Sequence, residues 1–511
     1  MMPHALRLLC LLLSLAPLAA SGQPPGHQLT QRPWFETRTA HFDAFSCGTT
    51  QQVARLLERL EQFREAYYQL AGAQAVASPP IVVMAFPDHE TMRPFLPLYQ
   101  GKPANLSAFF MRGSDENLIA LSLADSESRS LEVVFHEYSH LLFRHNERFW
   151  PLWLKEGMAE IYSTFEVTGP HSVRIGKPIE HHLQLLAHSP MMPLSQLFAV
   201  THNSPAYNER NRQGIFYSES WLLAHYLMIA DSGARKARFG QLTALLRQGQ
   251  SPEEAFTNAF HTTLPAMQAE LRRYLERGKF ASLDLTVSGD LATTRAMVTR
   301  PMVPVEIWFR LGDQLLRVDR LDNAESYFAQ AQKIAPRSPL PLEGLGLLAA
   351  EQEKTEESAR LLREALQRGS ISFLAHYMYA RETYKLTAKS PDKYSALDKD
   401  QADAIRSELQ KSVALMPDFG PAQHLLGFLE MVQGENLSAA EQHLKKAIQL
   451  EPENPSYLLS LAQVQLRKND PDAARHTLEG LRVPYIDAEL RAHAKGLLQQ
   501  IGPKPKDDSG R

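Results

Sequence analysis

Two histidines and a glutamate stand close together in the segment His136-Glu137-Tyr138-Ser139-His140. Apolar residues flank this segment on both sides, which predicts a buried helix. Histidines four residues apart lie on the same face of a helix, so both rings can bind one Zn²⁺ with the glutamate beside them. The alternative is a pair of core histidines whose nitrogens are satisfied by hydrogen bonds. A buried pair of imidazoles beside a carboxylate needs a chemical reason, and metal binding supplies one.

A third ligand is expected from the helix that follows, whose sequence from Pro151 to Glu160 reads PLWLKEGMAE. Proline suits the first turn of a helix. Glu156 and Glu160 are four residues apart, so both can face the same site. One carboxylate can bind the metal, and the other can accept the second N–H of a ligand histidine and so fix its tautomer. The alternative for each glutamate is a solvated position on the helix surface.

The two motifs together, H-E-x-x-H and W-L-x-E-G-x-A-E, resemble the gluzincin metallopeptidases, and most closely the bacterial peptidase-MA-like domains. The resemblance covers about residues 32–280. It implies one Zn²⁺ per chain, with the ligands His136, His140 and Glu156. It also implies Glu137 as the general base and Glu160 as the carboxylate behind a ligand histidine.

Members of this family often carry a later tyrosine that stabilises the oxyanion, and the matching residue is Tyr217, at the start of an apolar helix. Tyr207 and His225 are alternatives, and Tyr217 can equally be a core tyrosine. The G-x-M-E-N strand with which aminopeptidases of the family grip a free amine is missing from the sequence. Together with a possible peptide-pairing edge strand at Asn117–Leu123, this favours an endopeptidase. The pair His181-His182 is expected at the surface rather than at a metal.

The chemistry implied by the resemblance is hydrolysis by activated water. Three protein ligands leave the fourth position of zinc to water, whose pKa falls from about 15.7 towards about 7. Glu137 would take the proton of that water and pass it to the leaving amine. Tyr217 would donate a hydrogen bond to the oxyanion.

The elements that must position these residues follow an α+β pattern, a small sheet followed by helices. Alternating and continuous apolar runs predict strands, and apolar residues at helical spacing predict helices. We expect strands within Trp34–Phe45, Ile81–Phe86, Leu106–Met111 and Leu118–Leu123, a helix at Gln51–Leu70, and helices from Leu131 to about Arg277. Residues 281–303 are expected to be a linker.

The second half of the chain repeats a pattern of large and small residues that is typical of tetratricopeptide repeats. The first unit carries its positions at Trp308, Leu311, Gly312, Ala324, Phe328, Ala331 and Pro336. We expect an all-α solenoid of about five repeats over residues 304–501, with a weaker unit at about 373–419 that holds an insertion at Ser390–Asp400. Ile486–Ile501 would be a capping helix and residues 502–511 a disordered tail. The concave face of such an array would bind a protein partner.

The N-terminus and the composition limit where this chemistry would take place. Residues 1–22 resemble a secretory signal peptide, too short in its apolar run for the ~20 residues of a transmembrane helix. We therefore expect an exported protein, periplasmic or secreted, without a membrane span after cleavage. Cleavage would remove Cys10 and leave Cys47 alone, so no internal disulfide is expected. A net charge of −3 argues against a nucleic-acid partner.

The sequence is compatible with three functions. The first is an exported zinc metallopeptidase, an endopeptidase acting on peptides or proteins, whose repeats bind substrate or partner. The second is a catalytically silent peptidase-like domain in a protein-binding scaffold of tetratricopeptide repeats. The third is a zinc hydrolase that acts on a non-peptide amide. The retention of every expected metal residue favours the first.

Overall fold

The structure is a computed structural model, and it describes residues 23–502 apart from 72–80, 125–126, 148, 202, 208–213, 292–295, 389–395, 453 and 482–487. The expected signal peptide and all but the first residue of the expected tail lie outside the described residues. No helix among the described residues is long and apolar enough to cross a membrane.

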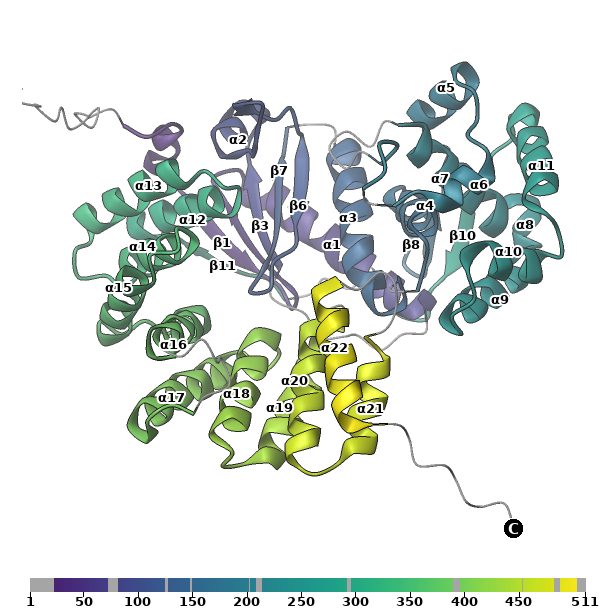
Figure 1. Cartoon of the computed structure of the whole chain (residues 1–511). Coiled ribbons are helices and arrows are strands. Elements are labelled where there is room, and N and C mark those ends of the chain that lie inside the picture. The colour runs from purple at the N-terminus through teal and green to yellow at the C-terminus, as the bar shows by residue number, and fades with distance from the viewer. Residues whose placement is uncertain are drawn as a thin grey trace, which may run out of the picture.

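The first half of the chain contains a mixed six-stranded sheet in the order β11-β1-β2-β3-β7-β6 (Figure 1). Its strands are β1 (Phe35–Arg38), β2 (Phe42–Ser46), β3 (Ile81–Phe86), β6 (Ala108–Met111), β7 (Asn117–Ser122) and β11 (Val298–Pro301). Strands β2, β3 and β7 run parallel to one another, and the other pairs are antiparallel. Helix α1 (Thr50–Ala71) lies between the parallel strands β2 and β3 in the sequence, as a parallel connection requires.

The position of β7 corrects the expected edge strand. The stretch Asn117–Leu123 was predicted to pair with an extended peptide, but β7 is hydrogen-bonded to β3 on one side and to β6 on the other. The chain reaches β7 by a tight hairpin from β6, which therefore takes the outer position. The edge at this end of the sheet is β6.

Both faces of the sheet are buried, and successive residues of β3 point to opposite sides, as the period of a strand requires. Ile81, Val83 and Ala85 contribute to one core with α1 and α3 (Glu127–Glu147). Val82, Met84 and Phe86 contribute to another core with the first repeat helices, α12 (Pro304–Arg317) and α13 (Leu321–Ile334). Figure 1 shows α12 and α13 on one side of the sheet and α3 on the other. The first repeat helices therefore complete a hydrophobic core of the first half of the chain.

The described parts of the expected linker, residues 281–303, contain two strands that pair with other elements. Strand β10 (Leu283–Thr286) pairs with β9 (Ser172–Ile175), and β11 pairs with β1 at the end of the main sheet. Strand β10 is thus part of a second, three-stranded sheet in the order β10-β9-β8. An edge strand with unpaired backbone groups gains hydrogen bonds when another strand covers it, which explains why this segment pairs with both sheets.

A charged contact also joins the repeats to the β6–β7 hairpin. The guanidinium of Arg317 on α12 lies 2.6 Å from Asp115 and 2.9 Å from Glu116. Arg310, two turns before, stacks on the ring of Phe45 at 4.4 Å. Because these groups are largely buried, their separation would leave charges without partners, which is strongly unfavourable.

The remaining elements of the first half surround α3 and α4. They are α4 (Leu152–Ser163), β8 (Glu166–Gly169), α5 (Glu180–His188), α6 (Leu194–Ala199), α7 (Ile215–Met228), α8 (Ala230–Gly233), α9 (Lys236–Arg247), α10 (Pro252–Phe260) and α11 (Leu264–Arg277). Short elements lie before α3 in the chain: η1 (His27–Gln31), α2 (His89–Met92), η2 (Arg93–Phe95), β4 (Leu98–Tyr99) and β5 (Lys102–Pro103). The expected helix at Gln51–Leu70 and the strand at Ile81–Phe86 are confirmed.

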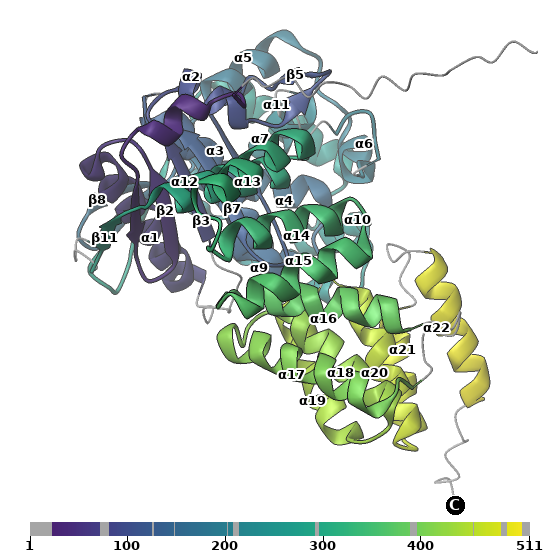
Figure 2. The same cartoon turned by 90° about the vertical axis from the view of Figure 1, so that its left-hand side faces the viewer.

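The second half is a solenoid of helix pairs, and the tetratricopeptide prediction is confirmed (Figure 2). After α12 and α13 come α14 (Leu340–Glu351), α15 (Thr355–Gln367), α16 (Phe373–Thr387), α17 (Lys399–Leu415), α18 (Gly420–Gln433), α19 (Leu437–Leu450), α20 (Pro455–Arg467), α21 (Pro471–Glu479) and the last helix α22 (Ala488–Ile501). The described part of the insertion, from residue 396, leads into α17. A methyl group on Gly312 would come within 2.7 Å of Phe328, which is why this repeat position must be small.

Candidate metal centre

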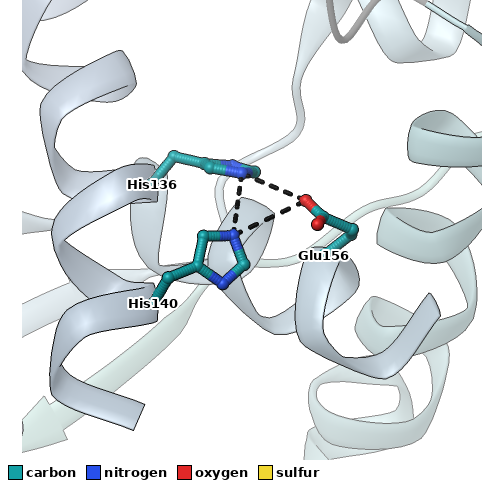
Figure 3. A group of neighbouring side chains, drawn as sticks. All are labelled: His136, His140 and Glu156. Carbon is teal, nitrogen blue, oxygen red and sulfur yellow. Dashed lines mark hydrogen bonds and ion pairs between the residues drawn. The ribbon is translucent and has the colours of Figure 1, made fainter. Parts of the chain in front are cut away.

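The three expected ligands converge at one point between α3 and α4 (Figure 3). Nε2 of His136 lies 3.3 Å from Nε2 of His140 and 3.3 Å from Oε2 of Glu156. Nε2 of His140 lies 3.6 Å from the same carboxylate oxygen. The helical spacing of the two histidines and the meeting of two separate helices thus produce a single cluster of donor atoms.

These separations fit a tetrahedral ion. Zinc holds imidazole nitrogen and carboxylate oxygen at ~2.0–2.2 Å, so two ligand atoms of a tetrahedral site lie ~3.3–3.6 Å apart. The three observed separations, 3.3, 3.3 and 3.6 Å, fall within that range. Two imidazoles and one carboxylate are also the donor set of open zinc sites, in which a fourth position remains for water.

The cluster is buried on one side and open on the other. The side chains of His136 and Glu156 are 3% and 6% exposed, whereas that of His140 is 26% exposed. Burial alone would raise the pKa of Glu156, but the neighbouring imidazoles of His140 and His136 lower it to about 2. Glu156 is therefore anionic at neutral pH. Access from solvent is on the side of His140.

The position of Glu156 depends on close packing of α4 against α7. The next residue, Gly157, faces the backbone of Ser220, and a methyl group there would meet the Cβ of Ala224 at 2.9 Å. Pro151 precedes the first helical residue, Leu152, as the N-cap. The absence of a side chain at residue 157 thus lets α4 approach closely enough to present Glu156 to α3.

Glu160 lies beside His136, as the sequence predicted. Its Oε1 is 3.3 Å from Nδ1 of His136, so this histidine can donate its N–H to the carboxylate and keep Nε2 for a metal. Burial would raise the pKa of Glu160, but the imidazoles of His136 and His182 hold it well below its usual value. The alternative of a solvated surface glutamate is wrong for this residue, which is buried.

His182 corrects the sequence interpretation. The pair His181-His182 was expected at the surface, and His181 is exposed, but His182 is fully buried. Its Nε2 lies 3.4 Å from Oε2 of Glu160, and its Nδ1 lies 2.9 Å from Oγ of Ser218 on α7. The spacing of His182 and Leu186, both buried on α5, is the signal that could have indicated an inward face.

The three candidates for the oxyanion donor lie in different surroundings. The hydroxyl of Tyr207 lies 3.4 Å from Oε1 of Glu156, and its ring stacks on that of Tyr217 with the centroids 5.9 Å apart. Tyr217 is buried at the start of α7. His225 contacts Tyr274 and the carbonyl of Gly176, so it is a core histidine.

Glu137 lies on α3 between the two ligand histidines and is half-buried. Its helical position next to His136 agrees with the role expected for it. Neither this role nor that of Tyr217 is tested by the geometry, and both remain predictions.

Comparison with known proteins identifies the repeats. Models of the tetratricopeptide repeat match residues 305–338 and 431–501. Neither match reaches the histidine motif, so the likeness to gluzincins rests on the residues alone. No curated protein sequence matches the chain.

Solved structures similar to this chain include two that are described as tetratricopeptide proteins. YrrB, described as having an unusual peptide-binding site, is 18% identical over 38% of this chain and 91% of its own, with a TM-score of 0.31. A thermophilic protein from Thermus thermophilus is 22% identical over 38% and 99%, with a TM-score of 0.29. MamA from Desulfovibrio magneticus is 20% identical over 39% and 97%, with a TM-score of 0.28.

Proposed function

We propose that the chain is an exported zinc-dependent endopeptidase whose tetratricopeptide repeats bind substrate or a partner protein. The observation that carries this proposal is the tetrahedral spacing of His136, His140 and Glu156, with Glu160 placed to fix the tautomer of His136. Two imidazole Nε2 atoms and a carboxylate oxygen that face one another can together bind one cation.

Several residues of the chain would each have a separate role in hydrolysis. When bound, zinc would lower the pKa of its water and polarise the substrate carbonyl. Glu137 accepts the proton of the attacking water and then donates it to the leaving amine. A tyrosine hydroxyl at the open side stabilises the oxyanion. Tyr217 is the donor implied by the family motif, and the hydroxyl of Tyr207 lies 3.4 Å from Oε1 of Glu156.

The substrate is expected to bind as an extended strand beside β6. This strand is the last of the sheet and lies next to α3, so a peptide paired with it would pass the metal ligands (Figure 1). Binding through main-chain hydrogen bonds does not require a free N-terminus, which is why we propose cleavage within chains. Peptides with blocked and free N-termini should be cleaved at similar rates, and a strict need for a free amine would contradict this part.

Metal analysis tests the proposal directly. The wild type should bind about one zinc per chain, and Glu156→Gln should lose it because the substitution removes a charged ligand. Glu137→Gln should keep the zinc but lose hydrolysis of a quenched peptide library. Glu132→Gln, an exposed position on the same helix, is the matched control and should change neither property.

Two results would overturn the proposal: a wild type that binds no zinc, or a hydrolysis that Glu137→Gln leaves unchanged. The first result would favour a silent domain in a repeat scaffold. Cleavage of a non-peptide amide in the absence of peptide cleavage would favour the third function considered for this sequence.

A further inference from the structure

We infer that His182 is a positioning residue for the metal centre and that the buried chain Ser218–His182–Glu160–His136 sets the affinity for zinc. This inference rests on the proposed function and extends it to two residues that the family resemblance does not assign. It starts from the buried position of His182, whose ring contacts Glu160 behind the metal ligands.

The chain of contacts links α7, α5, α4 and α3. Oγ of Ser218 lies 2.9 Å from Nδ1 of His182, and Nε2 of His182 lies 3.4 Å from Oε2 of Glu160. The other oxygen of Glu160 lies 3.3 Å from Nδ1 of His136. His182 and Ser218 are 0% exposed, so bulk water does not compete for these contacts.

The chemistry of the groups fixes which nitrogen of each histidine carries the proton in these contacts. The ionised carboxylate of Glu160 only accepts, so each histidine must offer it an N–H. His182 then carries its proton on Nε2 and leaves Nδ1 as an acceptor. The hydroxyl of Ser218 is the donor that Nδ1 requires. This arrangement uses both oxygens of Glu160 and leaves Nε2 of His136 free of a proton, as a metal ligand must be.

Serine, histidine and glutamate in this order resemble a nucleophilic triad, but the burial of this group excludes that role. Ser218 is fully buried on α7 and its histidine faces the protein interior. Glu160 is moreover shared with His136, so any displacement of His182 is transmitted to a metal ligand. The group therefore acts through Glu160.

His182 restrains Glu160 in the position that orients His136. Without His182, one carboxylate oxygen of a buried, charged side chain would lose its partner. The carboxylate would then rotate or take up water, and the imidazole of His136 would lose its fixed tautomer and angle. Removing a group that contacts a metal ligand from behind lowers metal affinity about 10–100-fold. For His182, which contacts such a group rather than the ligand itself, we expect a loss of about tenfold.

The test is the zinc affinity of the full chain, measured by competition with a chromophoric chelator. His182→Leu should weaken zinc binding about tenfold, and His182→Gln, whose amide can still donate to Glu160, should weaken it less. In the pair His182→Leu with Glu160→Gln, the losses should not add, because both act through the same carboxylate. His225→Leu is the matched control: this buried histidine on α7 contacts Tyr274 and not Glu160, so it should lower stability but not affinity.

Ser218→Ala provides a milder test if His182→Leu does not fold, since it removes one hydroxyl and should weaken zinc binding severalfold. The inference is overturned if the folded His182 or Ser218 variants bind zinc as tightly as the wild type, or if the losses of the double variant add fully. Failure of the wild type to bind zinc would instead refute the proposed function. The two failures are therefore distinguishable.

Discussion

Replacing Gly157 by alanine should weaken the metal centre, although the new methyl group would contact no ligand. The methyl would lie 2.9 Å from the Cβ of Ala224 and from the carbonyl carbon of Ser220, whose oxygen is closer still. Carbon atoms in favourable contact are ~3.5–4.0 Å apart. Helix α4 must therefore move from α7 by roughly 0.6–1 Å, or α7 must give way by the same distance.

This displacement has two measurable effects. Forcing an extra methyl into a packed core costs about 1–3 kcal/mol, of which the higher helix propensity of alanine offsets ~0.5–1 kcal/mol. We expect the free energy of unfolding in urea to fall by about 0.5–2 kcal/mol. Ligand distances in metal sites tolerate only about 0.2 Å, so the shift of the adjacent Glu156 should weaken zinc binding at least about tenfold.

Gly240→Ala is the matched control. Gly240 lies within α9 and is exposed, and a methyl group added there would have no atom within 4 Å outside its chain neighbours and its own helix backbone. The same substitution there should raise stability by ~0.5–1 kcal/mol and leave zinc affinity unchanged. If Gly157→Ala behaves like Gly240→Ala in both assays, close contact between α4 and α7 does not position the ligand, and the reasoning is refuted.

Three further predictions concern metal removal, pH and the repeats. A chelator should lower the melting temperature of the wild type but not that of Glu156→Gln, because only a bound ion stabilises the folded state; equal shifts would count against the site. Burial raises the pKa of Glu219 to about 8, so the folded chain keeps a proton that the unfolded chain releases near pH 4.5. The free energy of unfolding should therefore fall as the pH rises between these two values. Glu219→Gln should remove that loss in urea titrations at about pH 5 and about pH 9, and an unchanged slope would show that this carboxyl is not its source. Ending the chain at Val303 should abolish cooperative unfolding, whereas ending it at Leu450 should not. The reason is that α12 and α13 bury several apolar side chains on the sheet, and each contributes about 1.5–3 kcal/mol to stability. A stable fragment ending at Val303 would contradict the shared core.

The parts of the site that the sequence predicted lie close together along the chain. His136 and His140 share a face because a helix repeats every 3.6 residues, and the same rule relates Glu156 to Glu160. The repeat positions were predictable for a similar reason, since each helix pair packs mainly against its sequence neighbours. Spacing alone fixed the relative placement within each of these groups.

The parts that the sequence did not predict depend on contacts between distant segments. His182 is buried because α5 packs against α7, which brings it to Glu160 and Ser218. Tyr207, which contacts Glu156, lies outside the helices and strands, so no periodic pattern in the sequence indicates where its side chain points. The order of the strands, which makes β6 the edge and draws 298–301 onto β1, was likewise invisible in the local pattern.

The sequence by itself determined the donor atoms, their order along two helices and the architecture of the repeats, because these follow from periodicity and side-chain chemistry. Only the tertiary structure decided that the donor atoms meet at tetrahedral spacing, that a buried histidine stands behind them, and that the repeats cover one face of the sheet. The physical reason is that such contacts are set by packing between segments far apart in the chain. A close approach such as that of Gly157 to Ser220 depends on both segments at once.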